Sequence, residues 1–436
     1  NNSRIQFCTA RDSAVGSLSS KGIVAIQSNL LDSKPSKGSI VSDNTISNIG
    51  RQGLQVGGAI NGSFVSEEPS GENICENNKV TGCGAGVKIE AGRYQVFRNN
   101  EITDNNTGVD TGISISLDSC RNIDVYGNFI TNDLPSEDSV YGVFLGNTAT
   151  SGGAISEEIT IRSNLIHCTG NGRDLIRVAV PPRSIKIFSN VLIIDGAPTS
   201  DYGMFISGFA DNATLDVYNN TWVGGTNIIK TSGLTGVLTI NAYNNNFIGS
   251  SSRYLDDNIS GVVTWNLSNN NYFDAGAADS SIIRVSATQY STTTISNVDD
   301  DAVQFPPIFA GPDIGPIADR DYTTTNELLF GAGNDWPGSD VALDYTLESG
   351  YESPPSIGAF GLRFIPSSTG VTQGPLLFGS TDPAVIAQYA MTTTDQLPTD
   401  ALGGSFTDGG VIYSADGCDI NGNAIAITTP ADLVAF

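Results

Sequence analysis

The chain contains a single histidine, His167, and only 21 lysines and arginines among its 436 residues. A zinc site built from several histidines, or a reaction that needs two imidazoles, is therefore excluded. No run of 18 apolar residues occurs, so neither a transmembrane helix nor membrane insertion is predicted. The 46 acidic residues give a net charge of −25. Nucleic-acid binding is not expected, because contact with phosphates needs a basic face.

Cysteine is scarce as well, with six residues and no CxxC pair of the kind found in metal knuckles. Cys83 and Cys168 follow predicted turn asparagines by five and four residues, which favours free thiols stacked in an apolar core. The even number leaves disulfides open in an oxidising compartment. The segment Asp416–Gly422 lacks the alternating carboxylates and terminal glutamate of a calcium loop. No cofactor or metal is therefore predicted, and calcium is left open without a motif.

An internal repeat is the most informative feature that is present. An asparagine followed by a short apolar strand recurs at intervals that average about 28 residues, at Asn44, Asn78, Asn100, Asn128, Asn164, Asn190, Asn220, Asn246 and Asn271. A glycine followed by alternating apolar residues precedes many of these, at Gly22, Gly53, Gly86, Gly112, Gly142 and Gly203. Period-two alternation is the signal of a β-strand, so each repeat is predicted to hold two or three short strands.

Such a unit cannot bury its apolar face alone. If the chain coils, each strand pairs in parallel with its equivalent one turn later, ~4.8 Å away. Asparagine suits the turn because it tolerates left-handed backbone conformations, and its side chain can bond to the asparagine of the next coil as a ladder. The sequence therefore predicts an all-β solenoid. A β-sandwich with asparagine-rich turns is the alternative, but sandwich strands lack such a regular asparagine spacing.

With this repeat the sequence resembles the right-handed parallel β-helix proteins of the pectate-lyase-like superfamily over about residues 1–364. Residues 289–361 are similar to the C-terminal region of many such secreted proteins, through Gln289-Tyr290-Ser291-Thr292, Pro307-Ile308-Phe309, Asp321-Tyr322, Gly331-Ala332-Gly333 and Ile357-Gly358-Ala359-Phe360. The resemblance implies a right-handed parallel β-helix over 1–364 whose last coils and cap, about 272–364, cover the open end of the core. Residues 365–436 do not continue the repeat and are expected to form a small β domain or an oligomerisation tail.

Two long intervals place insertions at residues 57–72 and 146–157, on one edge of the helix and three coil steps or ~14 Å apart. The coils between them would form the floor of a groove. Alternation along residues 87–90 and 113–118 points Lys88, Glu90 and Asp118 outward. Carboxylates on neighbouring coils suit the acid and the base or nucleophile of a glycosidase. Glu90 and Asp118 are therefore the candidate catalytic residues.

Five further residues are candidates for substrate binding: Lys88, Arg93, Arg121, Phe144 and Arg177. Arg93 and Arg121 follow Glu90 and Asp118 by three residues, and Phe144 could stack on a sugar ring. Arg177 is expected in the column of Lys88, where it could neutralise a uronate carboxylate. The alternative is that Glu90–Arg93 and Asp118–Arg121 are ordinary solvated ion pairs that contribute little. His167 has no partner motif and is not predicted to be catalytic.

Catalytic patterns of related families transfer poorly. The GHG motif of polygalacturonase-like enzymes and the NGxExxR pattern of alginate- and chondroitin-lyase-like enzymes are absent, and Arg183-Ser184-Ile185-Lys186 only loosely resembles an RIK motif. The leading hypothesis is an extracellular or virion-surface protein, similar to a phage tailspike or tail fibre, that recognises a polysaccharide and has a homotrimer or virion neighbours as further partners. A secreted polysaccharide hydrolase or lyase is one alternative, so catalysis stays open. A purely structural virion or cell-surface protein without an active site is the other.

Overall fold

A computed structural model describes residues 4–12, 21–26, 39–57, 73–90, 92–105, 112–133, 140–146, 156–169, 173–195, 201–257, 262–274, 281–310, 316–324, 326–336, 344–347, 355–360, 405–407 and 411–413. The chain divides into two compact units, Asn1–Gly361 and Leu362–Phe436. In the second unit the described strands β31 (Ser405–Thr407) and β32 (Val411–Tyr413) pair antiparallel. Its role as a small β domain or an oligomerisation tail stays a prediction.

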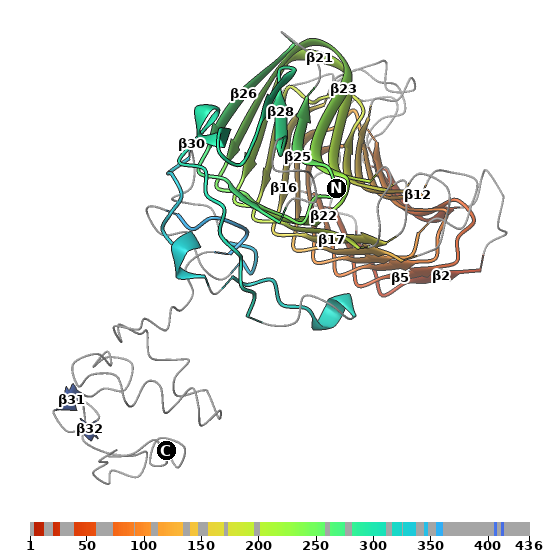
Figure 1. The fold of residues 1–436 in the computed structure, drawn as a ribbon. Helices are drawn as coiled ribbons and strands as arrows, with labels where there is room; N and C mark the ends of the chain where they lie inside the picture. The colour runs from red at the N-terminus through yellow and green to blue at the C-terminus, as the bar shows by residue number, and fades with distance from the viewer. Residues whose placement is uncertain are drawn as a thin grey trace. The chain divides into compact units, whose positions relative to one another are not determined.

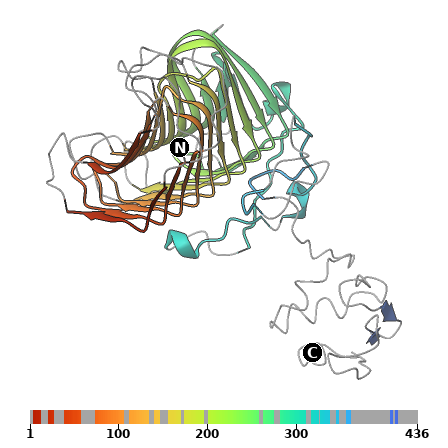
Figure 2. The same cartoon turned by 180° about the vertical axis from the view of Figure 1, so that it is seen from behind.

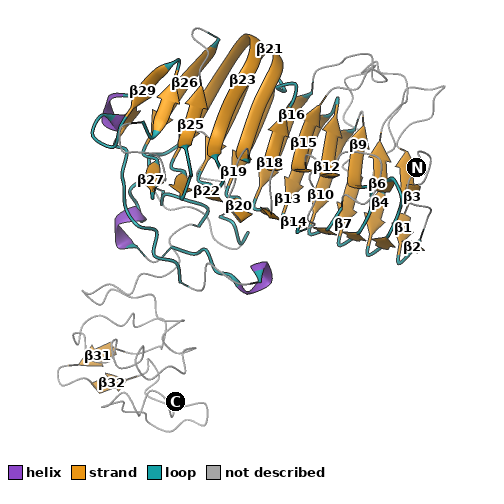
Figure 3. Cartoon of the chain, turned by 45° about the vertical axis from the view of Figure 1, so that its right-hand side comes forward, coloured by secondary structure: helices purple, strands orange, loops and turns teal. Residues whose placement is uncertain are grey.

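The first unit is a stack of coils with three faces, named here in the order in which each coil runs (Figures 1 and 3). The first face holds β3 (Lys21–Ile26), β6 (Gln52–Gly57), β9 (Ala85–Glu90), β12 (Gly112–Asp118), β15 (Val140–Gly146), β18 (Arg173–Val178), the first half of β21 (Tyr202–Tyr218) and of β23 (Asn227–Tyr243), β25 (Arg253–Asp257) and β28 (Ile283–Val285). The second face holds β1 (Arg4–Gln6), β4 (Ile40–Ser42), β7 (Asn73–Glu76), β10 (Arg93–Arg98), β13 (Arg121–Tyr126), β16 (Glu157–Arg162), β19 (Ser184–Phe188), the second half of β21 and β23, β26 (Val263–Ser268) and β30 (Asp299–Asp300).

The third face is a separate ten-stranded sheet of β2 (Thr9–Arg11), β5 (Thr45–Ser47), β8 (Lys79–Thr81), β11 (Glu101–Thr103), β14 (Phe129–Asn132), β17 (Leu165–Thr169), β20 (Val191–Asp195), β22 (Thr221–Gly224), β24 (Asn246–Ile248) and β27 (Asn271–Phe273). Because β21 and β23 run through both of the other faces, those faces merge into one 20-stranded sheet (Figure 2). Every described pairing from coil to coil is parallel. The predicted right-handed parallel β-helix is confirmed.

The interior is filled by side chains that stack in register from coil to coil. On the first face one inward column is fully buried along its length: Leu54, Val87, Ile115, Val143, Ile176, Met204, Ile229, Leu255 and Ile283. The third face contributes an opposing buried column of Ile46, Val80, Ile102, Ile130, Ile166, Leu192, Trp222, Phe247 and Tyr272. Each fully buried aliphatic side chain contributes about 1.5–3 kcal/mol, so these columns are the main source of stability.

The predicted asparagine ladder runs along the turn between the second and third faces. Nδ2 of each ladder asparagine donates to the side-chain oxygen of the next one at 2.8–3.0 Å, through Asn44, Asn78, Asn100, Asn128, Asn164, Asn190, Asn220, Asn245 and Asn270. The last donor, Asn270, bonds Asp299 Oδ2 at 2.7 Å. The stacking of Asn100, Asn128 and Asn164, on which the whole repeat prediction rested, is therefore present.

Two positions of the predicted ladder are wrong by one residue. Asn245 and Asn270 are the ladder residues, whereas Asn246 and Asn271 begin β24 and β27. The reason is that the inward apolar residue lies two positions after the ladder asparagine, and the triplets Asn244–Asn246 and Asn269–Asn271 hide this offset. The left-handed residue of the turn is also not the ladder asparagine. It is the residue before it, as at Asp43, Asn77 and Ser163, with φ of 52–55°.

The C-terminal part of the first unit consists of two segments, one inside the last coil and one outside the coils. Residues 281–303 complete the last coil: β28 and β30 pair with the preceding strands, β29 (Thr288–Tyr290) turns back antiparallel on β28, and Ile295 in η2 (Ile295–Asn297) is buried in the core. Described residues 316–360, with η3 (Ile317–Asp319) and η4 (Glu327–Leu329), lie instead along the outside of the coils. We call this segment the strap. A cap formed by the whole of 272–364 is not confirmed.

The strap is held at two places. The predicted motifs Gly331–Gly333 and Ile357–Phe360 dock on the turn asparagines, where Asn269 Nδ2 donates to the Ala332 carbonyl and the Gly358 N–H donates to the Asn244 carbonyl, both at 2.8 Å. Trp336 stacks on Tyr218, with ring centroids 4.6 Å apart. These contacts dock the motifs on the outside of the coils, and a capping role stays a prediction.

The cysteines in the described part of the chain form no disulfides: Cys8 is exposed, and Cys75, Cys83, Cys120 and Cys168 are buried. Burial raises the pKa of Cys83 to about 11. This agrees with the favoured interpretation of core thiols, and Cys418 lies outside the described residues. Among the helices of the described residues, none is long and apolar enough to cross a membrane.

Candidate functional site: an aromatic and ionic patch on the first face

The strands of the first face present their outward side chains in pairs three residues apart. On β18, Leu175 and Ile176 both point into the core, with 1% and 0% of their surface exposed. Two successive inward residues leave Asp174 and Arg177 as the flanking outward positions. The same spacing recurs on β15 at Tyr141 and Phe144 and, by register, on other strands of this face. The first face therefore carries two outward columns.

The register aligns these columns along the helix. One column contains Lys88, Ser116, Phe144, Arg177, Phe205, Lys230, Asp256 and Arg284. The second contains Ile113, Tyr141, Asp174, Tyr202, Asn227 and Arg253. The placement of Arg177 in the column of Lys88 was predicted and is confirmed.

At the centre of these columns an ion pair lies between two aromatic pairs. We call this group the aromatic–ionic patch; it consists of Tyr141, Phe144, Asp174, Arg177, Tyr202 and Phe205. The rings of Tyr141 and Phe144 are 5.6 Å apart, and those of Tyr202 and Phe205 are 5.1 Å apart. Arg177 Nη1 lies 3.2 Å from Asp174 Oδ2. The four aromatic side chains are half-buried, so part of each ring is accessible.

Arg177 also stacks on the flanking aromatic rings. Its Cζ lies 3.9 Å from the ring centroid of Phe205 and 5.9 Å from that of Tyr141. On the next strand, Lys230 Nζ donates to the Tyr202 hydroxyl at 3.2 Å and lies 4.7 Å from the ring centroid. Cation–π contacts of this kind hold long basic side chains in one orientation. Arg177 of the patch and the adjacent Lys230 are therefore oriented positive groups beside accessible aromatic surface.

Asp174 is the buried carboxylate of the patch, with only 4% of its surface exposed. Burial raises the pKa of Asp174 to about 7, although the charge and the hydrogen bond of Arg177 act in the opposite direction. The negative charge of Asp201 adds to the increase, and Lys230 reduces it. Asp174 can thus change its protonation near neutral pH.

The two aromatic pairs of the patch come from a short motif that occurs twice in the sequence. Tyr141-Gly142-Val143-Phe144 and Tyr202-Gly203-Met204-Phe205 share the pattern YGxF two coils apart. The glycine is required because a Cβ at Gly142 would lie 2.6 Å from the Leu175 carbonyl oxygen, and one at Gly203 would lie 2.7 Å from that of Ile228. Phe144 and Arg177 were predicted as binding residues; Asp174, Tyr202, Phe205 and Lys230 were missed. Comparison of the two YGxF segments could have identified the second aromatic pair.

The predicted catalytic residues are neighbours in the fold. Glu90 and Asp118 are register partners on β9 and β12, as the model of neighbouring coils required. The expected exposure of Asp118 is wrong, because only 5% of its surface is exposed. It accepts a hydrogen bond from Ser116 Oγ at 3.0 Å, and its Oδ2 lies 3.7 Å from Lys88 Nζ. The side chains of Glu90 and Arg93 lie outside the described part of the structure. The catalytic roles of Glu90 and Asp118 stay predictions.

Arg121 is not on the floor where it was expected. It begins β13 on the second face, beyond the turn that follows Asp118, and its Nε lies 3.3 Å from Glu157 Oε2. The predicted walls, residues 57–72 and 146–157, fall mostly outside the described residues. The strands that precede them, β6 and β15, do lie on the first face three coil steps apart.

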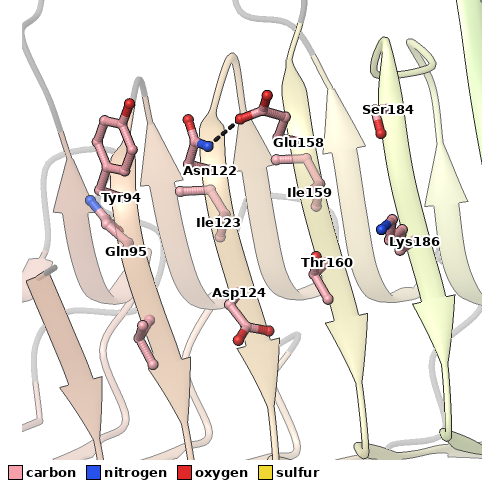
Figure 4. A pocket seen from close by; sticks show the side chains of 11 residues that line it. Tyr94, Gln95, Asn122, Ile123, Asp124, Glu158, Ile159, Thr160, Ser184 and Lys186 are labelled. Atoms are coloured by element: carbon pink, nitrogen blue, oxygen red, sulfur yellow. Dashed lines mark hydrogen bonds between the residues drawn. The ribbon is translucent and has the colours of Figure 1, made fainter. Parts of the chain in front are cut away.

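A concave region lies on the second face (Figure 4). It has a volume of about 430 Å³ and is lined by residues of β10, β13, β16 and β19.

Among the described residues no group of three or more histidine, cysteine, aspartate or glutamate side chains could hold a metal ion. The segment Asp416–Gly422 lies outside the described residues, and calcium stays an open prediction.

Comparisons with known proteins bear on the fold. No protein-family model matches the sequence, and no curated protein matches it. Among solved structures, pectate lyase Pel9A is similar with a TM-score of 0.46 and 15% identity, over 78% of this chain and 73% of that one. XylC, solved in complex with xylose, is similar with a TM-score of 0.42 and 15% identity, over 79% of this chain and 64% of that one. The parallel β-helix fold of this chain is established by its own parallel pairing from coil to coil.

Proposed function

We propose that the protein recognises a polysaccharide through the aromatic–ionic patch. The observation that carries the proposal is the alternation along the first face, where the Asp174–Arg177 ion pair lies between the Tyr141–Phe144 and Tyr202–Phe205 ring pairs. Aromatic faces with a polar edge suit the apolar faces of sugar rings, and fixed donors suit their oxygens. Each coil contributes one outward pair of side chains, aromatic or ionic, ~4.8 Å from the next. The patch therefore favours a chain of sugars that runs along the helix axis.

The charges of the patch favour a glycan that carries carboxylates or other acidic groups. Arg177 and Lys230 are both oriented by aromatic contacts. An acidic sugar that pairs with Arg177 would compete with Asp174, whose buried carboxylate can take up a proton near neutral pH. Proton uptake on binding is therefore part of the proposal, and affinity should rise as the pH falls toward about 7 from above and level off below it.

A test of this function compares the purified protein with two variants on an array of acidic and neutral polysaccharides. Phe205→Ala removes a stacking ring and Arg177→Ala removes the central cation, and each should weaken binding about tenfold. Phe7→Ala and Arg11→Ala are matched controls, because both side chains are exposed and lie far along the chain from the patch. Unchanged binding by both patch variants, or no glycan bound by the parent protein, would rule the proposal out.

Cleavage of the glycan is the second candidate function. The observation that favours it is the direct register between Glu90 and Asp118, because paired carboxylates on adjacent strands are the arrangement that glycoside hydrolysis uses. Reducing ends would report hydrolysis, and absorbance of unsaturated uronates would report lyase activity. Activity that survives Glu90→Gln and Asp118→Asn would remove both residues from the catalytic assignment.

The proposal also includes the setting in which recognition takes place. We infer an extracellular or virion-surface protein of the tailspike or tail-fibre type, with a homotrimer as its assembly. A long solenoid with one face dedicated to a glycan suits such a role. Sedimentation equilibrium of the whole chain would measure the oligomer, and a monomer at micromolar concentration would argue against the tailspike-like assembly.

A further inference from the structure

The hollow on the second face is bordered by a row of three residues from successive coils. Tyr94, Asn122 and Glu158 occupy equivalent positions near the starts of β10, β13 and β16 (Figure 4). Below them, Val96, Asp124, Thr160 and Lys186 form one outward column from strand to strand. A volume of about 430 Å³ lies within the range of about 300–1,000 Å³ that is typical of small-ligand sites.

All three residues of the upper row have a left-handed backbone. Their φ values are 50° for Tyr94, 55° for Asn122 and 55° for Glu158. Asparagine tolerates this conformation, but for tyrosine and glutamate it costs about 1–2 kcal/mol each. Glycine would avoid that cost and is used at other turns of this chain, such as Gly82 and Gly127. The same conformation occurs at other turns of the described chain, as at Asp43, Asn77 and Ser163, so the side-chain chemistry of the hollow must indicate the site.

The side chains of the hollow are arranged for polar contacts without a net charge. Asn122 Nδ2 donates to Glu158, and Asp124 accepts two hydrogen bonds from Arg162 at 2.8 and 3.1 Å. Arg162 is in turn fixed over the Tyr126 ring, 4.0 Å from its centroid. With Asp124 neutralised by Arg162, the charges of Glu158 and Lys186 balance. In a protein of net charge −25, such a hollow offers no attraction to an anion.

This chemistry differs from that of the aromatic–ionic patch. The hollow combines a half-exposed tyrosine ring with carboxylate and amide acceptors, the hydroxyls of Thr160 and Ser184, and one ammonium donor. An aromatic surface beside closely spaced donors and acceptors suits a ring that carries several hydroxyl groups and no charge.

We propose that the hollow is a second carbohydrate-binding site, which takes a neutral sugar of an oligosaccharide that lies across β10, β13 and β16. Tyr94 stacks on the sugar ring, the Asn122–Glu158 pair and Asp124 accept from its hydroxyls, and Lys186 donates to a ring or hydroxyl oxygen. The site is on a different face from the aromatic–ionic patch and does not depend on the function proposed there.

Glycine substitutions separate the binding role of the row from a structural one. Tyr94→Gly and Glu158→Gly remove the side chains and also relieve the left-handed strain. If the row exists for binding, these variants unfold at the same temperature as the parent protein or at a higher one, while affinity falls about two- to tenfold or more. Asn212→Gly is the matched control, because Asn212 is exposed, has a φ of 51° and does not line the hollow.

The binding measurement uses calorimetry and saturation-transfer NMR of the full chain with maltohexaose, cellohexaose, mannohexaose and xylohexaose. At least one should bind at micromolar to millimolar concentration, more weakly in Tyr94→Gly and in Lys186→Ala, and unchanged in Asn212→Gly and Arg177→Ala. Binding that Lys186→Ala and Tyr94→Gly leave intact would overturn the proposal, as would the absence of binding by all four oligosaccharides. Loss of binding in Arg177→Ala alone would assign the sugar to the first face and equally overturn it.

Discussion

At the scale of single residues, the side-chain amide of asparagine joins one coil to the next. Asn128 shows how fully the amide is used: its oxygen accepts from the backbone and the side chain of Asn100, and Nδ2 donates to Asn164 at 2.9 Å and to two backbone carbonyls at 3.0 Å. Buried groups that lose such partners each cost about 1–3 kcal/mol. A ladder amide therefore contributes far more than an exposed one.

Replacement of Asn128 by alanine should accordingly lower the free energy of unfolding by about 2–4 kcal/mol. The reason is that donors and acceptors of Asn100, Asn164 and the backbone are left buried without partners. Asn266→Ala is the control, because Asn266 bonds Asn241 at 2.7 Å on the exposed surface; it should change stability by less than about 0.5 kcal/mol. Urea denaturation measures the free energy of unfolding of both variants. An equal loss of stability in the two would show that a ladder amide contributes no more than an exposed one.

The ladder ends on a carboxyl group rather than an amide. Asp299 accepts from Asn270 and from the Tyr272 hydroxyl, each at 2.7 Å, and its surface is fully buried. Burial raises the pKa of Asp299 to about 7, and the hydrogen bonds from Asn270 and Tyr272 lower it by less. A protonated Asp299 resembles asparagine, since one oxygen accepts from Asn270 and the other can donate as a ladder amide does.

Asp299→Asn should therefore stabilise the protein at neutral and higher pH. In the unfolded chain the aspartate has a pKa of about 3.9, so folding favours the protonated form. Its contribution is complete below pH ~3.9 and is lost as the pH rises through about 7. We expect the substitution to raise the free energy of unfolding by about 2–4 kcal/mol at pH 8 and by almost nothing at pH 4. The measurement is the urea midpoint of both proteins at the two pH values, and a variant that is weaker at pH 8 would contradict this account.

The direction of a side chain could be predicted from the sequence where simple strand alternation holds. The prediction failed where contacts with neighbouring side chains decide whether a residue is buried. The inward positions of Val87 and Ile89 and the outward position of Lys88 follow from alternation alone. The burial of Asp118 does not, because it depends on Ser116 and Lys88 of the same and the adjacent strand. The Asp174–Arg177 pair was also invisible to alternation, since two successive inward residues shift the outward side chains to a spacing of three.

At the scale of elements, the strap has a further contact with the coils, a polar cluster where it crosses the third face. His167, which was not predicted to be catalytic, is buried with its Nε2 3.0 Å from Asp195 and its Nδ1 3.3 Å from Asp133. Arg320 of the strap bonds the same Asp195 oxygen at 2.5 Å. Asp195 thus links the strap to the coils.

Asp195→Asn should loosen the strap and leave the coils folded. Burial alone would raise the pKa of Asp195, but hydrogen bonds from His167 and Arg320 outweigh it and lower the pKa to about 2. The stabilisation is therefore present above pH ~3.9 and is lost as the pH falls toward 2, with a magnitude of about 1 kcal/mol after solvent screening. Limited proteolysis between residues 316 and 360 should become faster at pH 7.

The control for this experiment is Asp211→Asn. Asp211 also pairs with an arginine, Arg183, at 3.1 Å, but both side chains are exposed on the second face. Proteolysis should not change in this variant, because exposed ion pairs contribute little. Equal proteolysis of the parent protein and Asp195→Asn would show that the aromatic contacts of Trp336 and the turn asparagines hold the strap alone.

The strands of the coils could be predicted from the sequence, but the site where the strap docks on them could not. The Asn-strand repeat led to the correct course of coils because parallel stacking allows one register for a buried column. The motifs at 331–333 and 357–360 were recognised, but their docking site was not. It is made by Asn219, Asn244 and Asn269, which precede ladder residues and carry no signal of their own in the sequence.

At the scale of the whole molecule, the net charge of −25 opposes the compact state. The described ion pairs engage much of the positive charge, as in Arg98–Glu76, Arg162–Asp124 and Arg284–Asp256. The acidic residues in excess of these pairs repel one another, and salt screens that repulsion over a Debye length of ~10 Å at 0.1 M. Surface ion pairs weaken with salt too, but each is worth little.

Thermal unfolding should therefore shift upward with sodium chloride between about 0.01 and 0.5 M. The expected change is a few degrees, because repulsion among distant charges is screened first while the buried ladder is unaffected. Scanning calorimetry at several salt concentrations measures it, with sucrose of equal osmolality as the uncharged control. A melting temperature that falls with salt would mean that the ion pairs outweigh the repulsion.

The backward turn of β29 on β28 has a consequence for self-association. A solenoid whose last strand keeps a bare parallel edge can accept the first strand of another copy and grow into a fibre. On the first face that edge of β28 is already occupied by β29, which runs in the opposite direction. End-to-end polymerisation through the first face is thereby blocked at β28, and the second face ends on the two acidic residues of β30.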